Sequence, residues 1–216
     1  MTPRPLPDSS IYDGILDVPG ISEDRQGWHS THEIFGKLMR ETNARTIIEC
    51  GSWKGASAIH MADLRMNMVG ESFVLYACDT WLGGIDHDLT QENPTSVLKR
   101  ERGYPLLYQQ FLYNVAKAGL QNHIVPVVQT SVNAARLLRA HGISAELIYV
   151  DGSHEGMDPF WDILAYWPLL KKGGIMFGDD WGFPDVKASV FRFLSEAKLW
   201  PRLELVDDNF WIIRKP

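Results

Sequence analysis

The stretch from Glu146 to Trp181 constrains the fold of this chain more than any other. Two short apolar runs in it end in acidic residues: Leu147 to Val150 before Asp151, and Gly174 to Phe177 before Asp179 and Asp180. Apolar runs separated by a helical segment predict a β-α-β unit in a parallel sheet. A right-handed crossover makes the two strands neighbours, and their carboxyl ends then meet where open α/β sheets bind ligands. The three carboxylates and His154 should therefore converge on one rim, which we predict to be a metal-holding site.

The length of 216 residues suits a single α/β domain spanning residues 1–216. An apolar content of 45% is sufficient for a complete core. The net charge of -6 and the lack of basic blocks argue against nucleic acid as a partner. We therefore expect the partner to be a small molecule.

Cys50 and Cys78 are the only cysteines, which gives no disulfide framework, and both should be small buried hydrophobic residues. The first ten residues lack the apolar core of a signal peptide, and no apolar run reaches membrane-spanning length. We expect a soluble, cytoplasmic protein without membrane association.

Residues 1–43 should form an N-terminal arm and a first helix, which Ser30 or Thr31 can cap and which ends near Asn43. Further helices are expected at 56–65, 104–120, 132–139 and 184–198. Strands at 46–48, 73–77 and 123–128 join the two strands of the opening unit, and 203–206 with 210–213 form a closing hairpin. The pattern predicts an α/β fold with seven strands, five of them parallel and two in a C-terminal antiparallel hairpin.

The polar stretch at 82–103 has no structural period, and such a long segment in a compact domain is typical of a functional lid. Within this candidate lid insertion, Asp86, His87 and Asp88 either face an acceptor molecule or are solvated. Trp28 and His29 of the arm are further candidates to fold over an acceptor. The arm and the lid are also segments through which a homodimer could form.

The glycine turn Gly51-x-x-x-Gly55 follows the first strand. Its spacing is neither that of a P-loop nor Gly-x-Gly-x-x-Gly, so a dinucleotide is disfavoured but stays open. Glu49, directly before the turn, suits a cationic ligand, and Asp79, at the end of the second strand, can accept both hydroxyls of a ribose. Together they indicate a positively charged nucleoside, a description that S-adenosylmethionine fits.

The motif Glu49-x-Gly-x-x-x-Gly55 followed by Asp79 resembles the class I S-adenosylmethionine-dependent methyltransferases, whose Rossmann-like sheet has the predicted strands and final hairpin with helices on both faces. Three further motifs resemble the metal-dependent O-methyltransferases of sugars and natural products, of the macrocin O-methyltransferase type. These motifs are Asp79-Thr80-Trp81, Asp151-Gly-Ser-His154 and Gly-Asp179-Asp180-Trp181.

The resemblance implies a divalent cation, usually Mg²⁺, bound by Asp151, Asp179 and Asp180, with His154 as general base and Asp151 as a second catalytic residue. It implies cofactor contacts from residues at four strand ends: Glu49, Gly51, Ser52, Gly55, Asp79, Thr80, Trp81, Thr130, Ser131 and Asp151. His and Asp replace the Lys and Asn of the related catechol-type enzymes, which favours an aliphatic hydroxyl as the small-molecule acceptor.

Several of these residues also have an ordinary structural interpretation. Asp151 could cap a helix, the Asp179–Asp180 pair could be turn residues, and Ser131 is best interpreted as a helix cap. Trp53, Trp81 and Trp181 are candidates to line the pocket, whereas Trp161, Trp167, Trp200 and Trp211 are interpreted as packing residues. An NAD-dependent oxidoreductase and a nucleoside-binding protein without catalysis are the alternative functions.

Overall fold

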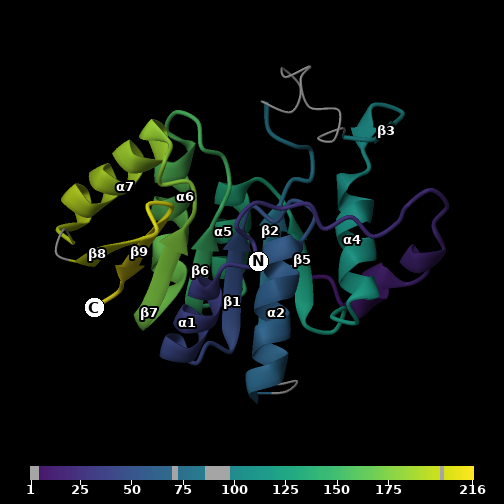
Figure 1. Cartoon of the computed structure of the whole chain (residues 1–216), viewed down its shortest axis with the longest axis horizontal. Helices are drawn as coiled ribbons and strands as arrows, with labels where there is room; N and C mark the ends of the chain where they lie inside the picture. The colour runs from purple at the N-terminus through teal and green to yellow at the C-terminus, as the bar shows by residue number, and fades with distance from the viewer. Residues whose placement is uncertain (1–4, 70–72, 86–97, 200–201) are drawn as a thin grey trace.

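The computed structural model describes residues 5–69, 73–85, 98–199 and 202–216. Its centre is a seven-stranded sheet in the order β5-β2-β1-β6-β7-β9-β8. The strands are β1 (Thr46–Cys50), β2 (Val74–Asp79), β5 (Ile124–Val128), β6 (Ala145–Val150), β7 (Leu170–Gly178), β8 (Leu203–Val206) and β9 (Phe210–Arg214). Figure 1 shows the strands of this sheet side by side across the view, with helices in front of and behind them.

Five strands of the sheet are parallel, since β1 pairs with β2 and β6, β2 with β5, and β6 with β7. The final hairpin inserts antiparallel, with β9 between β7 and β8. The predicted Rossmann-like α/β sheet with a C-terminal antiparallel hairpin is therefore confirmed. The strand order reverses between β1 and β6, which leaves the ends of these two strands open to a ligand.

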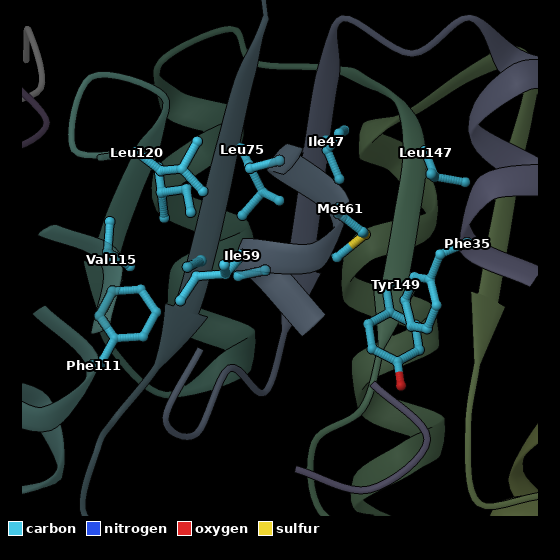
Figure 2. Packing of buried hydrophobic residues seen from close by; sticks show 14 of the residues in the cluster. Phe35, Ile47, Ile59, Met61, Leu75, Phe111, Val115, Leu120, Leu147 and Tyr149 are labelled. Atoms are coloured by element: carbon cyan, nitrogen blue, oxygen red, sulfur yellow. The ribbon is translucent and has the colours of Figure 1, made fainter. Parts of the chain in front are cut away.

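Helices cover both faces of the sheet (Figure 1). On one face lie α1 (Glu33–Thr42), α2 (Ala56–Val69) and α4 (Leu107–Lys117), and on the other α5 (Ser131–Ala140), α6 (Asp158–Tyr166) and α7 (Pro184–Ala197). Side chains alternate along each strand, so Ile47 packs under the first group and Ile48 under the second. Figure 2 shows the first core, where Phe35 of α1 meets Tyr149 of β6 edge to face, with ring centroids 5.0 Å apart.

The N-terminal arm contains two short 3₁₀ helices, η1 (Ser9–Tyr12) and η2 (Ile15–Asp17), which lie against α4. In Figure 1 the arm, in purple, passes beside α4 and then runs across the sheet to α1. The prediction of Ser30 or Thr31 as cap of α1 is wrong, because His32 is the cap and its Nδ1 accepts from Ile34 N at 3.1 Å. The predicted end at Asn43 is confirmed, since Asn43 closes the helix in a left-handed conformation.

The candidate lid is described only at its two ends, and Asp86, His87 and Asp88 lie outside the described residues, as does Trp200. The distal end forms a small antiparallel sheet that the sequence did not predict, of β3 (Arg100–Glu101) and β4 (Tyr104–Pro105). The remaining 3₁₀ helix, η3 (Trp167–Leu169), connects α6 to β7. None of the described helices combines the length and apolar character that crossing a bilayer requires.

Candidate active site

The predicted site residues follow the carboxyl ends of neighbouring strands. Asp79 is the last residue of β2, and Asp151 comes directly after β6. Asp179 and Asp180 follow β7, where Asp180 has a left-handed backbone with φ +63°. Such a conformation is rare for residues other than glycine and is often found at functional sites. These residues and His154 line one cavity of about 860 Å³.

The glycine turn packs directly against the backbone of Asp151. Gly51 has φ +85°, and a Cβ at this position would lie 1.9 Å from the carbonyl oxygen of Asp151. Gly51 N donates to Cys78 O at 2.9 Å, while Asp151 N donates to Cys50 O at 2.8 Å. Only glycine can occupy position 51, so the turn and Asp151 form one side of the cavity.

The carboxylate of Asp79 organises two loops at once. Its Oδ2 accepts from the backbone N–H groups of Ser52 and Trp53, both at 2.9 Å, and its Oδ1 accepts from Trp81 N at 2.7 Å. Asp79 therefore joins the glycine turn to the end of β2. It also lines the cavity, where its oxygen atoms keep lone pairs for a ligand.

Glu49 lies beneath the glycine turn and is fully buried. Its two carboxylate oxygens accept from Ser52 Oγ and Ser57 Oγ, each at 2.5 Å. Burial raises the pKa of Glu49 to about 7, against the lowering effect of the two hydroxyl donors. Ser52 and Ser57 line the cavity and Glu49 supports them from behind.

The pKa values of the three carboxylates at the ends of β6 and β7 are all raised. Burial, reinforced by the charges of Asp179 and Asp180, raises the pKa of Asp151 well above its ordinary value. Tyr149 Oη donates to Asp151 Oδ2 at 3.0 Å. Burial likewise raises the pKa of Asp179 and of Asp180. Among the described residues, however, no three His, Cys, Asp or Glu side chains are gathered as a ready-made metal site.

Two histidines flank this acidic cluster. His154 Nδ1 lies 3.7 Å from Asp180 Oδ2, and the ring of His154 packs on Phe183 with centroids 4.3 Å apart. His29, from the arm, lies with its Nδ1 3.3 Å from Asp179 Oδ2. Asn209, from the turn between β8 and β9, donates to Asp179 Oδ1. His29 was only a candidate in the sequence, and nothing there indicated Asn209.

A polar clamp, formed around the buried side chains of Lys54 and Asn114, holds the arm beside the cavity. Lys54 Nζ donates to Asp24 Oδ2 at 2.6 Å and to Gln26 Oε1 at 2.8 Å. Asn114 of α4, which is fully buried, donates to the backbone oxygens of Asp24 and Lys54, both at 2.7 Å. Gly27 then lies so close to α2 that a Cβ on it would be 2.8 Å from Ala56 Cβ. Because the clamp fixes the path of the arm, Trp28 and His29 lie at the cavity wall.

Not every predicted cofactor residue reaches the cavity. Gly51, Ser52, Asp79, Thr80, Thr130, Ser131 and Asp151 line it. Glu49, Gly55 and Trp81 lie behind the lining. Trp81 is buried with its ring against Phe111, and its Nε1 donates to Trp53 O at 2.8 Å, so the expectation that its indole lines the pocket is wrong.

The other tryptophan predictions divide in the same way. Trp53 lines the cavity as expected, whereas Trp181 is buried beside it. Trp211 is a buried packing residue, and Trp167 packs on Phe193. The prediction of Trp161 as a packing residue is wrong, because it lines the cavity and is 49% exposed. Its position on α6 gave no sequence signal that distinguishes an outward-facing indole from a core one.

Ser131 does not cap α5, so that interpretation is wrong. The cap residue is Thr130, which makes no side-chain capping bond, and Ser131 is the first residue of the helix. The hydroxyl of Ser131 instead donates to Asp162 Oδ1 of α6. Asp162 is a buried acid in the cavity lining that the sequence did not single out.

Comparison with known proteins supports a methyltransferase. The profile of a family described as a methyltransferase domain matches residues 48–181. This match covers more than half of the chain, and the chain belongs to that methyltransferase family. No curated protein sequence matches the chain closely enough to count as a relative.

Solved structures of O-methyltransferases share the fold. CalS11, a calicheamicin methyltransferase, is 20% identical over 84% of this chain and 77% of its own, with a TM-score of 0.60. An O-methyltransferase from Bacillus cereus in complex with S-adenosylhomocysteine is 13% identical over 97% and 92%, with a TM-score of 0.60. TomG from Streptomyces achromogenes, an O-methyltransferase of tomaymycin synthesis in complex with S-adenosylmethionine, is 16% identical over 96% and 89%, with a TM-score of 0.58. At such low sequence identities, the structural similarity shows a common fold and nothing further.

Proposed function

We propose that this protein is an S-adenosylmethionine- and divalent-metal-dependent O-methyltransferase that acts on a hydroxyl of a sugar or a small natural-product-like metabolite. The observation that carries the proposal is the position of Asp151. Its backbone packs on the glycine turn, and its carboxylate lines the same cavity as Asp179 and Asp180. A nucleoside bound at the glycine turn and a hydroxyl bound at the three carboxylates would therefore lie in the same cavity.

The cofactor assignment rests on the family and on the acid that ends β2. Asp79 faces the cavity beside the glycine turn, where a carboxylate suits the hydroxyls of a ribose. Related folds bind S-adenosylmethionine or S-adenosylhomocysteine. Glu49 is suited to a cationic ligand, because a sulfonium or ammonium group nearby would favour its charged form. The alternative function, an NAD-dependent oxidoreductase, is disfavoured because this chain lacks the glycine motif of dinucleotide-binding proteins.

The metal assignment rests on the type and charge of the donors. Asp151, Asp179 and Asp180 offer carboxylate oxygens, which Mg²⁺ prefers, and their mutual repulsion is the penalty that a bound cation removes. Their side chains would have to turn towards a common point, since they are not gathered in this conformation. When bound, such a cation lowers the pKa of a coordinated hydroxyl and neutralises the developing alkoxide.

The residues around the acids would orient the acceptor and remove its proton. His154 lies at the cavity wall with its ring fixed by Phe183 and its Nδ1 towards Asp180, so it can accept the hydroxyl proton as general base. Because about a third of its side chain is exposed, at 32%, the proton can then pass to solvent. Methyl transfer otherwise depends on alignment of the oxygen behind the methyl group, which a shaped cavity supplies.

The lining disfavours an anionic acceptor. The described residues that line the cavity include seven carboxylates and no Lys or Arg. CalS11 is described as a TDP-rhamnose 3′-O-methyltransferase, which supports a sugar hydroxyl, but an acidic cavity would repel a diphosphate. Exposed Trp28 and Phe183 at the wall provide flat surfaces for a sugar or an aromatic aglycone.

A ligand titration tests the proposed function. S-adenosylhomocysteine should raise the melting temperature, whereas NAD should leave it unchanged, because only a ligand of the native state stabilises it. Asp79→Asn is the matched variant: it keeps the size of the side chain and should weaken this stabilisation while the stabilisation by Mg²⁺ persists. Stabilisation by NAD alone would refute the methyltransferase proposal, and full activity in the presence of EDTA would refute the metal.

A further inference from the structure

An acidic side chain outside the proposed metal cluster forms part of the cavity wall. Asp162 belongs to α6 and is 4% exposed. Its Oδ1 accepts from the hydroxyl of Ser131 at the start of α5, and a Cβ on Gly152 would lie only 2.8 Å from its Oδ2. The residue at position 152 must therefore lack a side chain for the Asp162 carboxylate to reach the cavity wall.

The burial of Asp162 has no compensating cation. Burial raises its pKa to about 6, and only neutral donors, the Ser131 hydroxyl and the Cys50 thiol, oppose this effect. No ion pair joins it to a Lys, Arg or His among the described residues. A buried carboxylate costs free energy unless it is well hydrogen-bonded. Such a group at a cavity wall can be satisfied by a donor that a ligand brings.

The order of the strands indicates which part of the ligand reaches Asp162. The acid cluster follows β6 and β7, the glycine turn follows β1, and Asp79 ends β2. A nucleoside with its sulfonium near the acids and its ribose at Asp79 directs its base towards the next strand end, that of β5. Ser131 follows this strand, and α6 packs on α5 there, which brings Asp162 and exposed Trp161 into the same part of the cavity.

We propose that Asp162, oriented by Ser131, recognises the adenine of the cofactor by accepting a hydrogen bond from its exocyclic amino group. This inference rests on the proposed S-adenosylmethionine cofactor and adds a specificity-determining residue to it. Trp161, on the adjacent position of α6, offers its indole to the face of the base. A carboxylate accepts from an amino group, so a purine without this group leaves Asp162 without its donor and should bind more weakly.

The test compares S-adenosylhomocysteine with its 6-deamino purine analogue, which differs only in the replacement of the amino group by hydrogen. Isothermal titration at pH 8 with the wild-type protein should show a preference for the adenine ligand of about 10- to 100-fold, the range for a hydrogen bond to a charged group. Asp162→Asn keeps the size of the side chain and should reduce this preference to about threefold or less. Asp162→Glu, which moves the charge by one methylene, is a second variant and should reduce the preference for the adenine ligand by at least about fivefold.

The matched control is Asp158→Asn, which makes the same charge change one turn earlier on α6, at an exposed residue that also lines the cavity. It should keep the wild-type preference. A wild-type protein that binds both ligands equally would overturn the proposal without any variant, as would a folded Asp162→Asn protein with the wild-type preference. A preference lost in Asp158→Asn instead would also overturn it. A wild-type protein that binds neither ligand would instead refute the proposed cofactor itself.

Discussion

Replacement of Glu49 by Gln should stabilise the protein at alkaline pH and weaken its binding of a cationic cofactor. The carboxyl is fully buried, and its pKa of about 7 lies above the ordinary 4.5. An acid whose pKa is raised by folding binds its proton more tightly in the folded state. Its contribution to stability is therefore present below about pH 4.5, falls as the pH rises, and is lost above about pH 7.

The magnitude follows from the two pKa values. The difference between about 7 and 4.5 corresponds to about 3 kcal/mol, since each pKa unit is worth about 1.4 kcal/mol. Gln avoids this loss but weakens the hydrogen bonds from Ser52 and Ser57, at a cost of about 1 kcal/mol. The net gain at pH 8 is about 2 kcal/mol, which raises the melting temperature of a chain of this length by roughly 4–8 °C.

Thermal denaturation followed by circular dichroism between pH 5 and 8 measures this effect. The melting temperature of Glu49→Gln minus that of the wild type should increase with pH up to about 7 and then level off. Glu196→Gln, at an exposed glutamate paired with Arg192, is the control and should show a small difference with no such step. A difference for Glu49→Gln that does not vary with pH would refute the reasoning, and unchanged affinity for S-adenosylmethionine would refute its proposed role.

Three further variants probe the rim of the sheet. Asp151→Asn removes a carboxyl whose pKa is raised by burial and by the neighbouring acids; without metal it should melt at a higher temperature than the wild type, increasingly so as the pH rises, and it should lose stabilisation by Mg²⁺. Retained stabilisation by Mg²⁺ would contradict this role. His154→Ala should lower kcat about 10²- to 10⁴-fold while the affinity for S-adenosylhomocysteine stays the same, and an unchanged kcat would exclude it as the base. Gly27→Ala places a Cβ 2.8 Å from Ala56 Cβ and should destabilise the protein by about 1–3 kcal/mol; adding Ala56→Gly should recover most of this loss, and a double variant as unstable as the single one would contradict the packing argument.

The sheet was predictable because its signals are local. Each strand is an apolar run that ends in a turn or an acid, and parallel pairing brings consecutive run ends to one edge. Asp79, Asp151 and Asp179 therefore share a cavity wall as the pattern predicts. The strand that precedes or carries each of these residues fixes the position of its backbone at this edge of the sheet.

The remaining parts of the site depend on contacts between segments far apart in the chain. His29 reaches Asp179 across 150 residues, through an arm whose path is fixed by the clamp of Lys54 and Asn114. Asp162 lies within an amphipathic helix, where its spacing does not distinguish the cavity wall from the surface. Trp81 has a left-handed backbone with φ +53°, which turns its indole into the core. No local pattern encodes these arrangements.

The account depends most directly on whether one cation joins the ends of β6 and β7 beside the cofactor. A crystal of the protein with S-adenosylhomocysteine and Mn²⁺, measured at the manganese absorption edge, tests this in one measurement. We predict a single anomalous peak within coordination distance of Asp151, Asp179 and Asp180, next to the sulfur of the bound ligand. A structure with the ligand in place, no peak, and the carboxylates still apart would contradict the account.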